Sequence, residues 1–290
     1  MRAAVRRRDG EGVADTVETG DVDGATDWSL ALSGVDTVIH LAARVHQMGD
    51  HAVAEAAYML INKEATIALA RAAIAGGARR FVYVSSVKAA GEISPQRPLA
   101  ESDPPQPQDA YGRSKLAAER ALTALAGQIE VSIVRPPLVY GPGVRANFLS
   151  LLKLAASGLP LPLGAARAPR SMVFIDNLVD ALIACATRPH GSPATYFVSD
   201  GHDFSVAELL RLLRAEMGLA SRLWTLPGGV VRSAARLLGR ADAAQRLFSP
   251  LQVDSGRIRR ELGWSPPVTA EEGLRQTVRW FLDARAKGAI

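Results

Sequence analysis

The sequence predicts an α/β fold in which a doubly wound parallel sheet is joined to a smaller, mostly helical lobe. Three short runs rich in β-branched and aromatic residues, at 36–41, 80–85 and 129–134, are bounded by Gly, Pro or charged residues, as buried strands are. Helical stretches separate these runs, and this alternation indicates a parallel sheet with helices on its faces. After the turn at 141–143, helical patterns dominate.

Two helices are predicted between the three strands. Apolar residues recur at helical spacing between 57 and 74, and Gly76 with Gly77 ends that pattern. A second helix is expected over 110–126, with Asp109 as its N-cap and Gly127 just past its C-terminus. Crossovers of this kind are nearly always right-handed, which favours the doubly wound arrangement.

The second half of the chain is predicted to form the helical lobe. The boundary is placed so that residues 1–145 form the sheet domain and 146–290 the lobe, with about 171–200 returning to the sheet. Within it, a strand is expected at 194–198, and helices are expected at 147–157, 177–187, 206–217, 229–238 and 270–286.

Composition narrows the class of protein. The 290 residues are 48% hydrophobic and 22% charged, with a mean hydropathy of +0.07, which indicates a soluble globular chain and excludes a disordered one. Cys185 is the single cysteine, so no intrachain disulfide forms, and a reducing, cytoplasmic location is expected. No apolar run approaches the roughly 20 residues that span a bilayer, and no secretory signal begins the chain.

Charge and histidine patterns argue against two other classes of function. The net charge of +5 is modest, and aromatic residues do not interleave with the basic ones, so nucleic-acid binding is not expected. His40, His46 and His51 are close in sequence, but no cysteine or acidic cluster accompanies them, and no metal site is predicted.

The sharpest chemical pattern joins Tyr111 and Lys115 to Ser86. The tyrosine and the lysine are four residues apart on a predicted helix and therefore share a face. An ammonium beside a phenol favours the phenolate and lowers the pKa of the tyrosine, which makes it a usable acid or base for a substrate hydroxyl. Ser86 follows a strand, where open α/β sheets bind ligands, and its hydroxyl can hold the same oxygen.

With these residues in view, the chain resembles the extended short-chain dehydrogenase/reductase family, in particular the NAD-dependent epimerase/dehydratase branch that acts on nucleotide sugars. It looks most similar to the UDP-glucose 4-epimerase-like members. The matching segments run in the family's order over almost the whole chain: 20–22, 38–43, Asn62, 81–86, 111–115, 135–143 and 262–266.

The resemblance implies a role for each matched residue. Tyr111 would be the acid/base, Lys115 would lower its pKa and hold the nicotinamide ribose, and Ser86 would bind the reacting oxygen. Cofactor contacts are implied for Asp21, Val22, Leu41, Ala42, Ala43, Asn62, Tyr111, Lys115, Pro136 and Pro137. Substrate contacts are implied for Ser86, Lys88, Asn147 and Arg170, the last because a guanidinium pairs well with phosphate.

Two departures from the family pattern stand out. Leu138 occupies a position where members often carry an asparagine, so polar contacts to the substrate must differ there. The glycine-rich fingerprint of a Rossmann-like fold is absent, because the strand-like segment at 2–6 begins almost at Met1. We therefore expect the first strand–helix unit to be missing, and the sequence leaves open whether Met1 is a misplaced start. Without that unit, the chain is expected to have marginal stability or solubility, weak cofactor binding and little turnover.

The expected function is NAD(P)-dependent epimerisation of a nucleotide sugar, or reduction of a 4-keto sugar, with a UDP-hexose or UDP-N-acetylhexosamine as substrate in surface-polysaccharide synthesis. Arg6, Arg7 and Arg8 follow the first strand and suit a 2′-phosphate, so NADP is predicted to be tolerated beside NAD, although Asp9 is close. The competing hypothesis is an inactive, cofactor-poor binding or regulatory protein. The sequence leaves a homodimer open.

Overall fold

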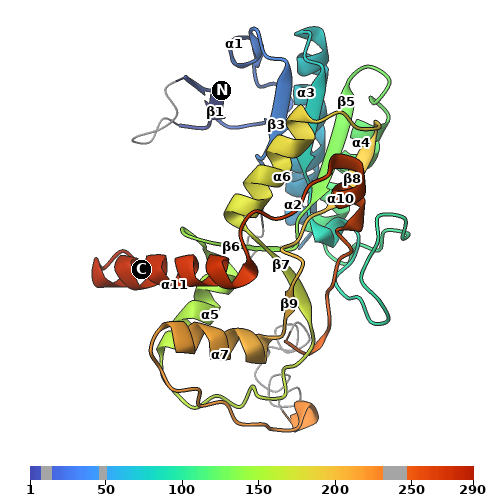
Figure 1. Cartoon of the computed structure of the whole chain (residues 1–290). Helices are drawn as coiled ribbons and strands as arrows, with labels where there is room; N and C mark the ends of the chain where they lie inside the picture. Colours follow the sequence, from blue (N-terminus) through green and yellow to red (C-terminus); the bar gives the residue numbers. More distant parts are fainter. Residues whose placement is uncertain (8–14, 46–50, 231–246) are drawn as a thin grey trace.

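The computed structural model describes residues 1–7, 15–45, 51–230 and 247–290. A parallel sheet with its helices occupies one end of the molecule, and α5, α7 and α11 gather at the other end (Figure 1). The chain passes between the two ends more than once, so residues distant in sequence meet where the ends join.

The main sheet has four parallel strands in the order β3 (Thr37–His40), β4 (Arg80–Val84), β5 (Glu130–Arg135) and β8 (Ala194–Phe197). The four predicted strands are thus confirmed, with ends that differ by at most one residue. Phe81, Val82 and Tyr83 of β4 are fully buried, because helices cover both faces of the sheet. The parallel α/β fold predicted from the sequence is confirmed.

The segment at the start of the chain forms a separate small sheet. β1 (Ala3–Val5) pairs in parallel with β2 (Thr16–Glu18), and within the described ranges neither strand pairs with the four-stranded sheet. The expected single sheet is therefore observed in two parts. Arg2 positions β1 beside the short helix α1 (Ser29–Leu32), since its Nη1 donates to the carbonyl oxygens of Leu30 at 3.1 Å and Ser33 at 2.8 Å.

A continuous helical run follows β3. It comprises α2 (His51–Tyr58), a π-helical turn η1 (Met59–Glu64) and α3 (Ala65–Ala75), so the helix predicted at 57–74 is confirmed but begins earlier. The chain then enters β4. Single-turn π segments inside helices are frequent at functional sites, and this one contains Asn62.

Helix α4 (Ala110–Thr123) begins at the predicted N-cap, but its predicted end is wrong. Gly127 lies beyond the helix and does not adopt the left-handed conformation of a glycine cap. The last turn is instead closed by short-range bonds from the Leu125 amide to the Leu122 carbonyl, 2.9 Å, and from the Ala126 amide to the Thr123 carbonyl, 3.2 Å. These bonds satisfy the terminal carbonyls without a glycine.

The second end of the molecule is built around a small three-stranded sheet. β6 (Leu138–Tyr140), β7 (Arg170–Phe174) and β9 (Asp203–Phe204) were not predicted. β6 and β9 are too short to show a strand pattern, and only the last two residues of β7 are β-branched or aromatic. Three predicted helices pack on them: α5 (Ala146–Ala156), α7 (Val206–Glu216) and α11 (Ala270–Ala286). The segment expected to return to the main sheet does so through α6 (Ile175–Thr187) and β8, whereas β7 pairs with β6.

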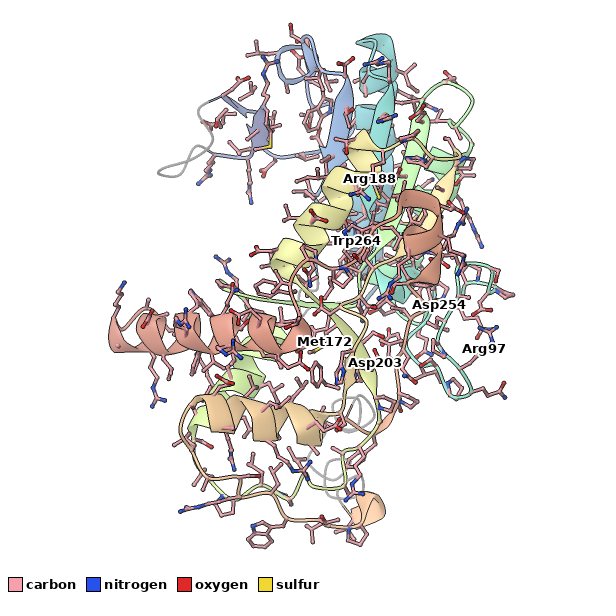
Figure 2. The ribbon with its side chains drawn as sticks, viewed as in Figure 1. Arg97, Met172, Arg188, Asp203, Asp254 and Trp264 are labelled. Atoms are coloured by element: carbon pink, nitrogen blue, oxygen red, sulfur yellow. The ribbon has the colours of Figure 1, made fainter. Side chains whose placement is uncertain are left out.

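Two short elements complete the described chain: the 3₁₀ turn η2 (Val87–Ala89) and α10 (Gly256–Leu262). Trp264 follows α10 and is buried, with its indole nitrogen donating to Asp180 of α6 at 2.7 Å (Figure 2). The helix expected at 229–238 lies almost entirely outside the described residues. Over the described ranges, no helix combines the length and apolar character that crossing a membrane requires.

Candidate active site

The predicted catalytic residues meet at the carboxyl end of β4. Ser86 lies two residues after the strand, and Tyr111 is in the first turn of α4. Asp109 caps this helix, since its Oδ1 accepts a hydrogen bond from the Gly112 amide at 2.7 Å. A Cβ at Gly112 would stand 2.5 Å from the backbone oxygen of Lys88, so glycine is required where α4 approaches η2.

The Ser86 side chain lies near Tyr111 and favours the ionised form of its phenol. The Ser86 hydroxyl also accepts the amide hydrogen of Lys88 at 3.2 Å, which fixes its direction at the start of η2. Both side chains are half-buried, so a ligand can reach them. The structure therefore brings together the two groups that sequence reasoning placed on one reacting oxygen.

The pKa of Tyr111 is raised to about 12, opposite to the expected direction. Burial is the main cause, Asp109 and Tyr58 add to it, and the nearby Ser86 hydroxyl opposes it. The Lys115 ammonium lies 6.0 Å from the centre of the Tyr111 ring. It donates instead to the Val84 carbonyl at 2.8 Å, which explains why it does not lower the pKa of the phenol here.

Lys115 is a buried cation whose ammonium is only partly paired. Its side chain lies over the Tyr83 ring, with Nζ 4.6 Å from the ring centre. Burial lowers its pKa to about 7, and the negative charge of Glu119 opposes that shift. An ammonium has three donors, and within the described residues one of them is used, on Val84. The remaining donors suit the hydroxyl oxygens of a ribose, so this end of the site fits a nicotinamide nucleotide.

His40, at the end of β3, is buried beside Lys115 and bonds to the Thr66 hydroxyl at 3.0 Å. Burial, with a smaller contribution from the charge of Lys115, lowers its pKa from 6.5 to about 3. The neutral imidazole is thus a structural element of the sheet rather than a proton donor at neutral pH.

Acid is expected to destabilise the fold through His40. Between pH 6.5 and pH 3 the unfolded chain takes up a proton that the folded chain does not, so the stability present above pH 6.5 is lost as pH falls. The loss should be about 2–3 kcal/mol by pH 4.5. Urea unfolding at pH 7 and pH 4.5 measures it, and His40→Gln should flatten the dependence. The exposed His202 supplies the control, His202→Gln. If the free energy of unfolding depends on pH equally in His40→Gln and in the unmodified protein, other groups cause the loss of stability in acid.

Asn62 anchors the segment that carries the predicted cofactor contacts after β3. Its fully buried amide accepts from the Arg44 backbone nitrogen at 2.8 Å and donates to the Arg44 carbonyl at 3.1 Å and to the Ser114 hydroxyl at 2.9 Å. Leu41 is 63% exposed and Ala42 is also exposed, while Ala43 is half-buried. Asn62 therefore shapes the surface presented by its neighbours, and its own polar atoms are used within the protein.

The other predicted cofactor residues lie at two places. Pro136 and Pro137 are buried directly after β5, and the Pro136 carbonyl accepts from the Val87 amide at 2.9 Å, which ties them to the Ser86 segment. Asp21 is exposed after β2 and forms an ion pair with Arg6, and the adjacent Val22 packs against the core beneath it. Residues Arg8 and Asp9 lie outside the described part of the chain.

The predicted substrate residues are not gathered at one point. Lys88 is held by Asp109 at 2.5 Å and by Glu92 at 3.3 Å, so its charge is engaged within the protein. Asn147 is exposed at the start of α5. Arg170, at the start of β7, donates from Nη1 to the Ser249 carbonyl at 2.9 Å. The last two belong to the end of the molecule opposite the main sheet.

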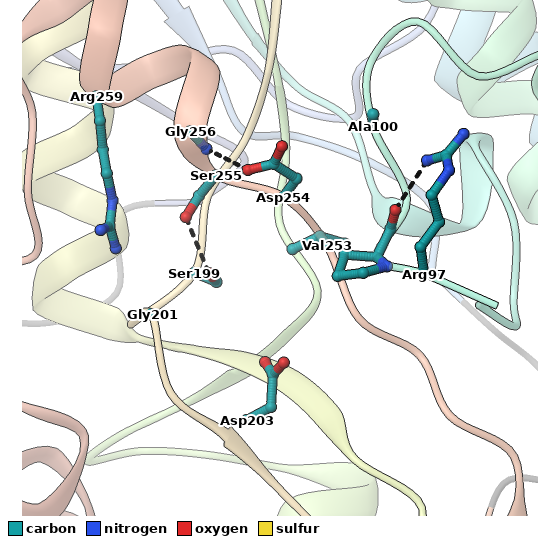
Figure 3. Close-up of a pocket in the computed structure, with 11 residues that line it drawn as sticks. Arg97, Ala100, Ser199, Gly201, Asp203, Val253, Asp254, Ser255, Gly256 and Arg259 are labelled. Carbon is teal, nitrogen blue, oxygen red and sulfur yellow. Dashed lines mark hydrogen bonds between the residues drawn. The ribbon is translucent and has the colours of Figure 1, made fainter. Parts of the chain in front are cut away.

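A cavity of about 370 Å³ opens elsewhere, between the loop at 97–100, β9 and α10 (Figure 3). Arg97 and Arg259 face it from opposite sides, and Asp203 and Asp254 also line it. None of the predicted site residues lines this cavity. Within the described ranges, no group of three or more His, Cys, Asp or Glu side chains could hold a metal ion.

Glu119 is the residue at this site that sequence reasoning missed. It follows Lys115 by four residues on α4, as Lys115 follows Tyr111, so the same helical spacing could have indicated it. Its carboxylate is buried and bonds to Ser85 and Arg135.

Comparison with known proteins agrees with this arrangement. Residues 2–204 match the NAD dependent epimerase/dehydratase family. A UDP-glucose 4-epimerase of Vibrio cholerae is 41% identical over 98% of this chain and 87% of its own length.

This chain belongs to the NAD dependent epimerase/dehydratase family.

Two further proteins are similar to this chain at lower sequence identity. The structure of MoeE5 in complex with UDP-glucose and NAD superposes with a TM-score of 0.77 at 25% identity, covering 98% of this chain and 91% of that one. A 3-beta-hydroxysteroid dehydrogenase of Mycolicibacterium neoaurum is 24% identical over 92% of this chain and 80% of its own length. Three predictions from the sequence are confirmed by this membership: the α/β fold, the class of NAD-dependent epimerase/dehydratase enzymes, and a nicotinamide cofactor.

Proposed function

We propose that this enzyme epimerises a UDP-sugar at one of the sugar carbons that bear a hydroxyl group. Tyr111 acts as the acid/base, with Ser86 and Lys115 as its partners. The observation that carries the proposal is the placement of Ser86 near Tyr111 at the carboxyl end of β4, with the Lys115 ammonium 6.0 Å from the centre of the Tyr111 ring. The names of the Vibrio cholerae relative and of the MoeE5 complex support UDP-glucose as the first substrate to test.

The chain's own residues would act on the proton and the oxygen of the substrate hydroxyl. Tyr111 takes the hydroxyl proton as the carbon loses its hydride, and it returns the proton when the carbonyl is reduced on the other face. Ser86 holds the same oxygen throughout. When bound, a nicotinamide dinucleotide accepts the hydride and later supplies it.

Lys115 has a defined electrostatic task in this proposal. Because burial holds the pKa of Tyr111 at about 12, the phenolate needs a nearby positive charge to form at neutral pH. We propose that Lys115 supplies that charge when a ligand is bound, and it retains donors for ribose hydroxyls. Asp21, Val22, Leu41, Ala42, Ala43, Pro136 and Pro137 are the further residues that we propose hold the cofactor.

The direct test is to incubate the protein with NAD and UDP-galactose and to follow UDP-glucose by proton NMR. Formation of UDP-glucose with no net NADH supports the proposal. UDP-N-acetylglucosamine, a 4-keto nucleotide sugar with NADPH, and a 3β-hydroxysteroid extend the substrate panel. Turnover of the steroid alone contradicts the proposal, and the absence of both cofactor binding and turnover supports the alternative of an inactive, cofactor-poor binding or regulatory protein.

Tolerance of NADP is a separate prediction about the end of β1. Arg6 and Arg7 are exposed there, and Arg6 already pairs with the Asp21 carboxylate, so it can exchange that anion for a 2′-phosphate. We expect NAD and NADP to bind with dissociation constants within about tenfold of each other, about 1.4 kcal/mol. Arg6→Ala should weaken NADP more than NAD in fluorescence titrations, whereas Arg79→Ala, which removes a remote exposed arginine, should change neither. Strong discrimination against NADP by the unmodified chain contradicts this prediction.

A further inference from the structure

A buried ion pair lies directly beneath the proposed catalytic residues. The Arg135 and Glu119 side chains are 6% and 4% exposed, and they form two bonds, Nε to Oε1 at 3.0 Å and Nη2 to Oε2 at 2.5 Å. The Nη1 atom of Arg135 is also buried and has no hydrogen-bond partner. A buried ion pair with an unsatisfied donor adds little to folding stability, because the cost of removing both charges from water is about as large as the attraction between them. A role beyond stability is therefore worth seeking.

The Glu119 carboxylate joins the three elements that carry the site. Besides Arg135 at the end of β5, it accepts a hydrogen bond from the Ser85 hydroxyl at the end of β4, 2.5 Å. Ser85 immediately precedes Ser86, Arg135 immediately precedes Pro136, and Glu119 is one helical turn beyond Lys115. A single side chain thus fixes the relative positions of β4, β5 and α4 where each meets the site.

Glu119 also balances the buried charge. Lys115 is faced by His40 and Tyr83 from the sheet, and by Tyr111 and Glu119 from its own helix. Burial keeps the first three neutral near pH 7: it lowers the pKa of His40 and raises the pKa values of Tyr83 and Tyr111. Glu119 is the one anion in this group, and its charge opposes the loss of a proton from Lys115.

We propose that Glu119 is a positioning residue for the reaction: paired with Arg135 and Ser85, its carboxylate aligns the ends of β4, β5 and α4 and balances the positive charge of the Lys115 ammonium. The inference rests on the proposed function for its kinetic consequence, but its electrostatic part concerns Lys115 alone.

The test compares Glu119→Gln with the unmodified protein by two readouts. The chain has five lysines, Lys63, Lys88, Lys115, Lys153 and Lys287, so NMR of protein labelled at lysine Cε resolves each titration, with Lys115→Met for assignment. In Glu119→Gln the Lys115 midpoint should move to lower pH. With UDP-galactose and NAD, kcat at pH 8 should fall by roughly 10²-fold. The loss should be smaller at pH 6, because Lys115 regains its proton there.

Matched variants separate alignment and charge from folding. Glu55→Gln breaks the exposed Arg113–Glu55 pair on the outer side of the same helix and should change neither readout. The double variant Glu119→Gln/Arg135→Gln removes both charges of the pair, so neither partner is left charged without the other, and it carries the test if the single variant does not fold. It should recover the melting temperature of the unmodified protein, while the Lys115 midpoint remains lowered.

Two results would overturn the inference. A lowered melting temperature with an unchanged Lys115 midpoint and an unchanged pH profile means that the pair is only structural. An unchanged kcat in both variants also contradicts it. If the unmodified protein turns over no UDP-sugar, the proposed function fails separately, and the Lys115 titration still decides the electrostatic role of Glu119.

Discussion

Tyr111→Phe is expected to lower kcat on UDP-galactose by about 10²–10⁴-fold, the usual contribution of a general acid/base group. The substitution removes the hydroxyl that lies near Ser86 and keeps the ring that packs edge-on against Tyr58, with ring centres 6.1 Å apart. The fold and the dissociation constant for NAD should change little. Steady-state kinetics and cofactor titration measure the two quantities on the same preparation.

Tyr196→Phe is the matched control for the loss of a tyrosine hydroxyl. The Tyr196 hydroxyl donates to Glu261 at 2.8 Å, away from Ser86 and Lys115, so kcat should stay within about twofold of the unmodified protein if only the reacting tyrosine matters. Near-normal turnover by Tyr111→Phe would remove Tyr111 from the acid/base role. Equal losses in both variants would indicate damage to the fold.

Gly112→Ala is expected to destabilise the protein by about 1–3 kcal/mol and to reduce turnover. Its Cβ would lie 2.5 Å from the Lys88 oxygen and 3.1 Å from the Lys88 carbonyl carbon, and backbone atoms cannot turn aside as a flexible side chain can. Helix α4 would have to move away from η2, which takes Tyr111 away from Ser86. Chemical unfolding and kcat report the two effects.

The direction of this effect is diagnostic, because alanine is ordinarily better than glycine inside a helix by about 1 kcal/mol. Gly127→Ala is the control, since a Cβ there meets nothing within 4 Å. It should leave stability within about 0.5 kcal/mol of the unmodified protein and leave kcat unchanged. A stabilised and fully active Gly112→Ala variant would show that the contact between α4 and η2 relaxes freely.

Much of the sheet domain could be predicted because its central strands, β4 and β5, are largely buried on both faces. The segments of β3, β4 and β5 are rich in β-branched and aromatic residues, which is the pattern of a strand. Asp109 caps α4 and marks its start. The end of α4 could not be predicted, because the chain closes it with backbone bonds that involve no particular residue type. β6, β7 and β9 were missed because tertiary pairing, rather than local pattern, makes two to five residues into a strand.

The candidate site shows the same division. Helical spacing and strand ends located Ser86, Tyr111 and Lys115, since these depend on local geometry. The electrostatics did not follow from spacing: the pKa of Tyr111 moves upward because burial outweighs a lysine that bonds elsewhere. Arg170 was implied by the family resemblance, which cannot show that one of its donors is already used on the Ser249 carbonyl.

The three hydrogen bonds of Asn62 have a consequence for the thermodynamics of ligand binding. Ordering a free loop costs about 1–2 kcal/mol per residue, and a flexible segment incurs that cost when the ligand arrives. The bonds from Asn62 to both backbone groups of Arg44 hold the chain after β3 in place as part of folding. A ligand that contacts Leu41 and Ala42 therefore meets a surface already in one conformation. Its association should be limited by encounter rather than by rearrangement, with a small entropic penalty from this segment.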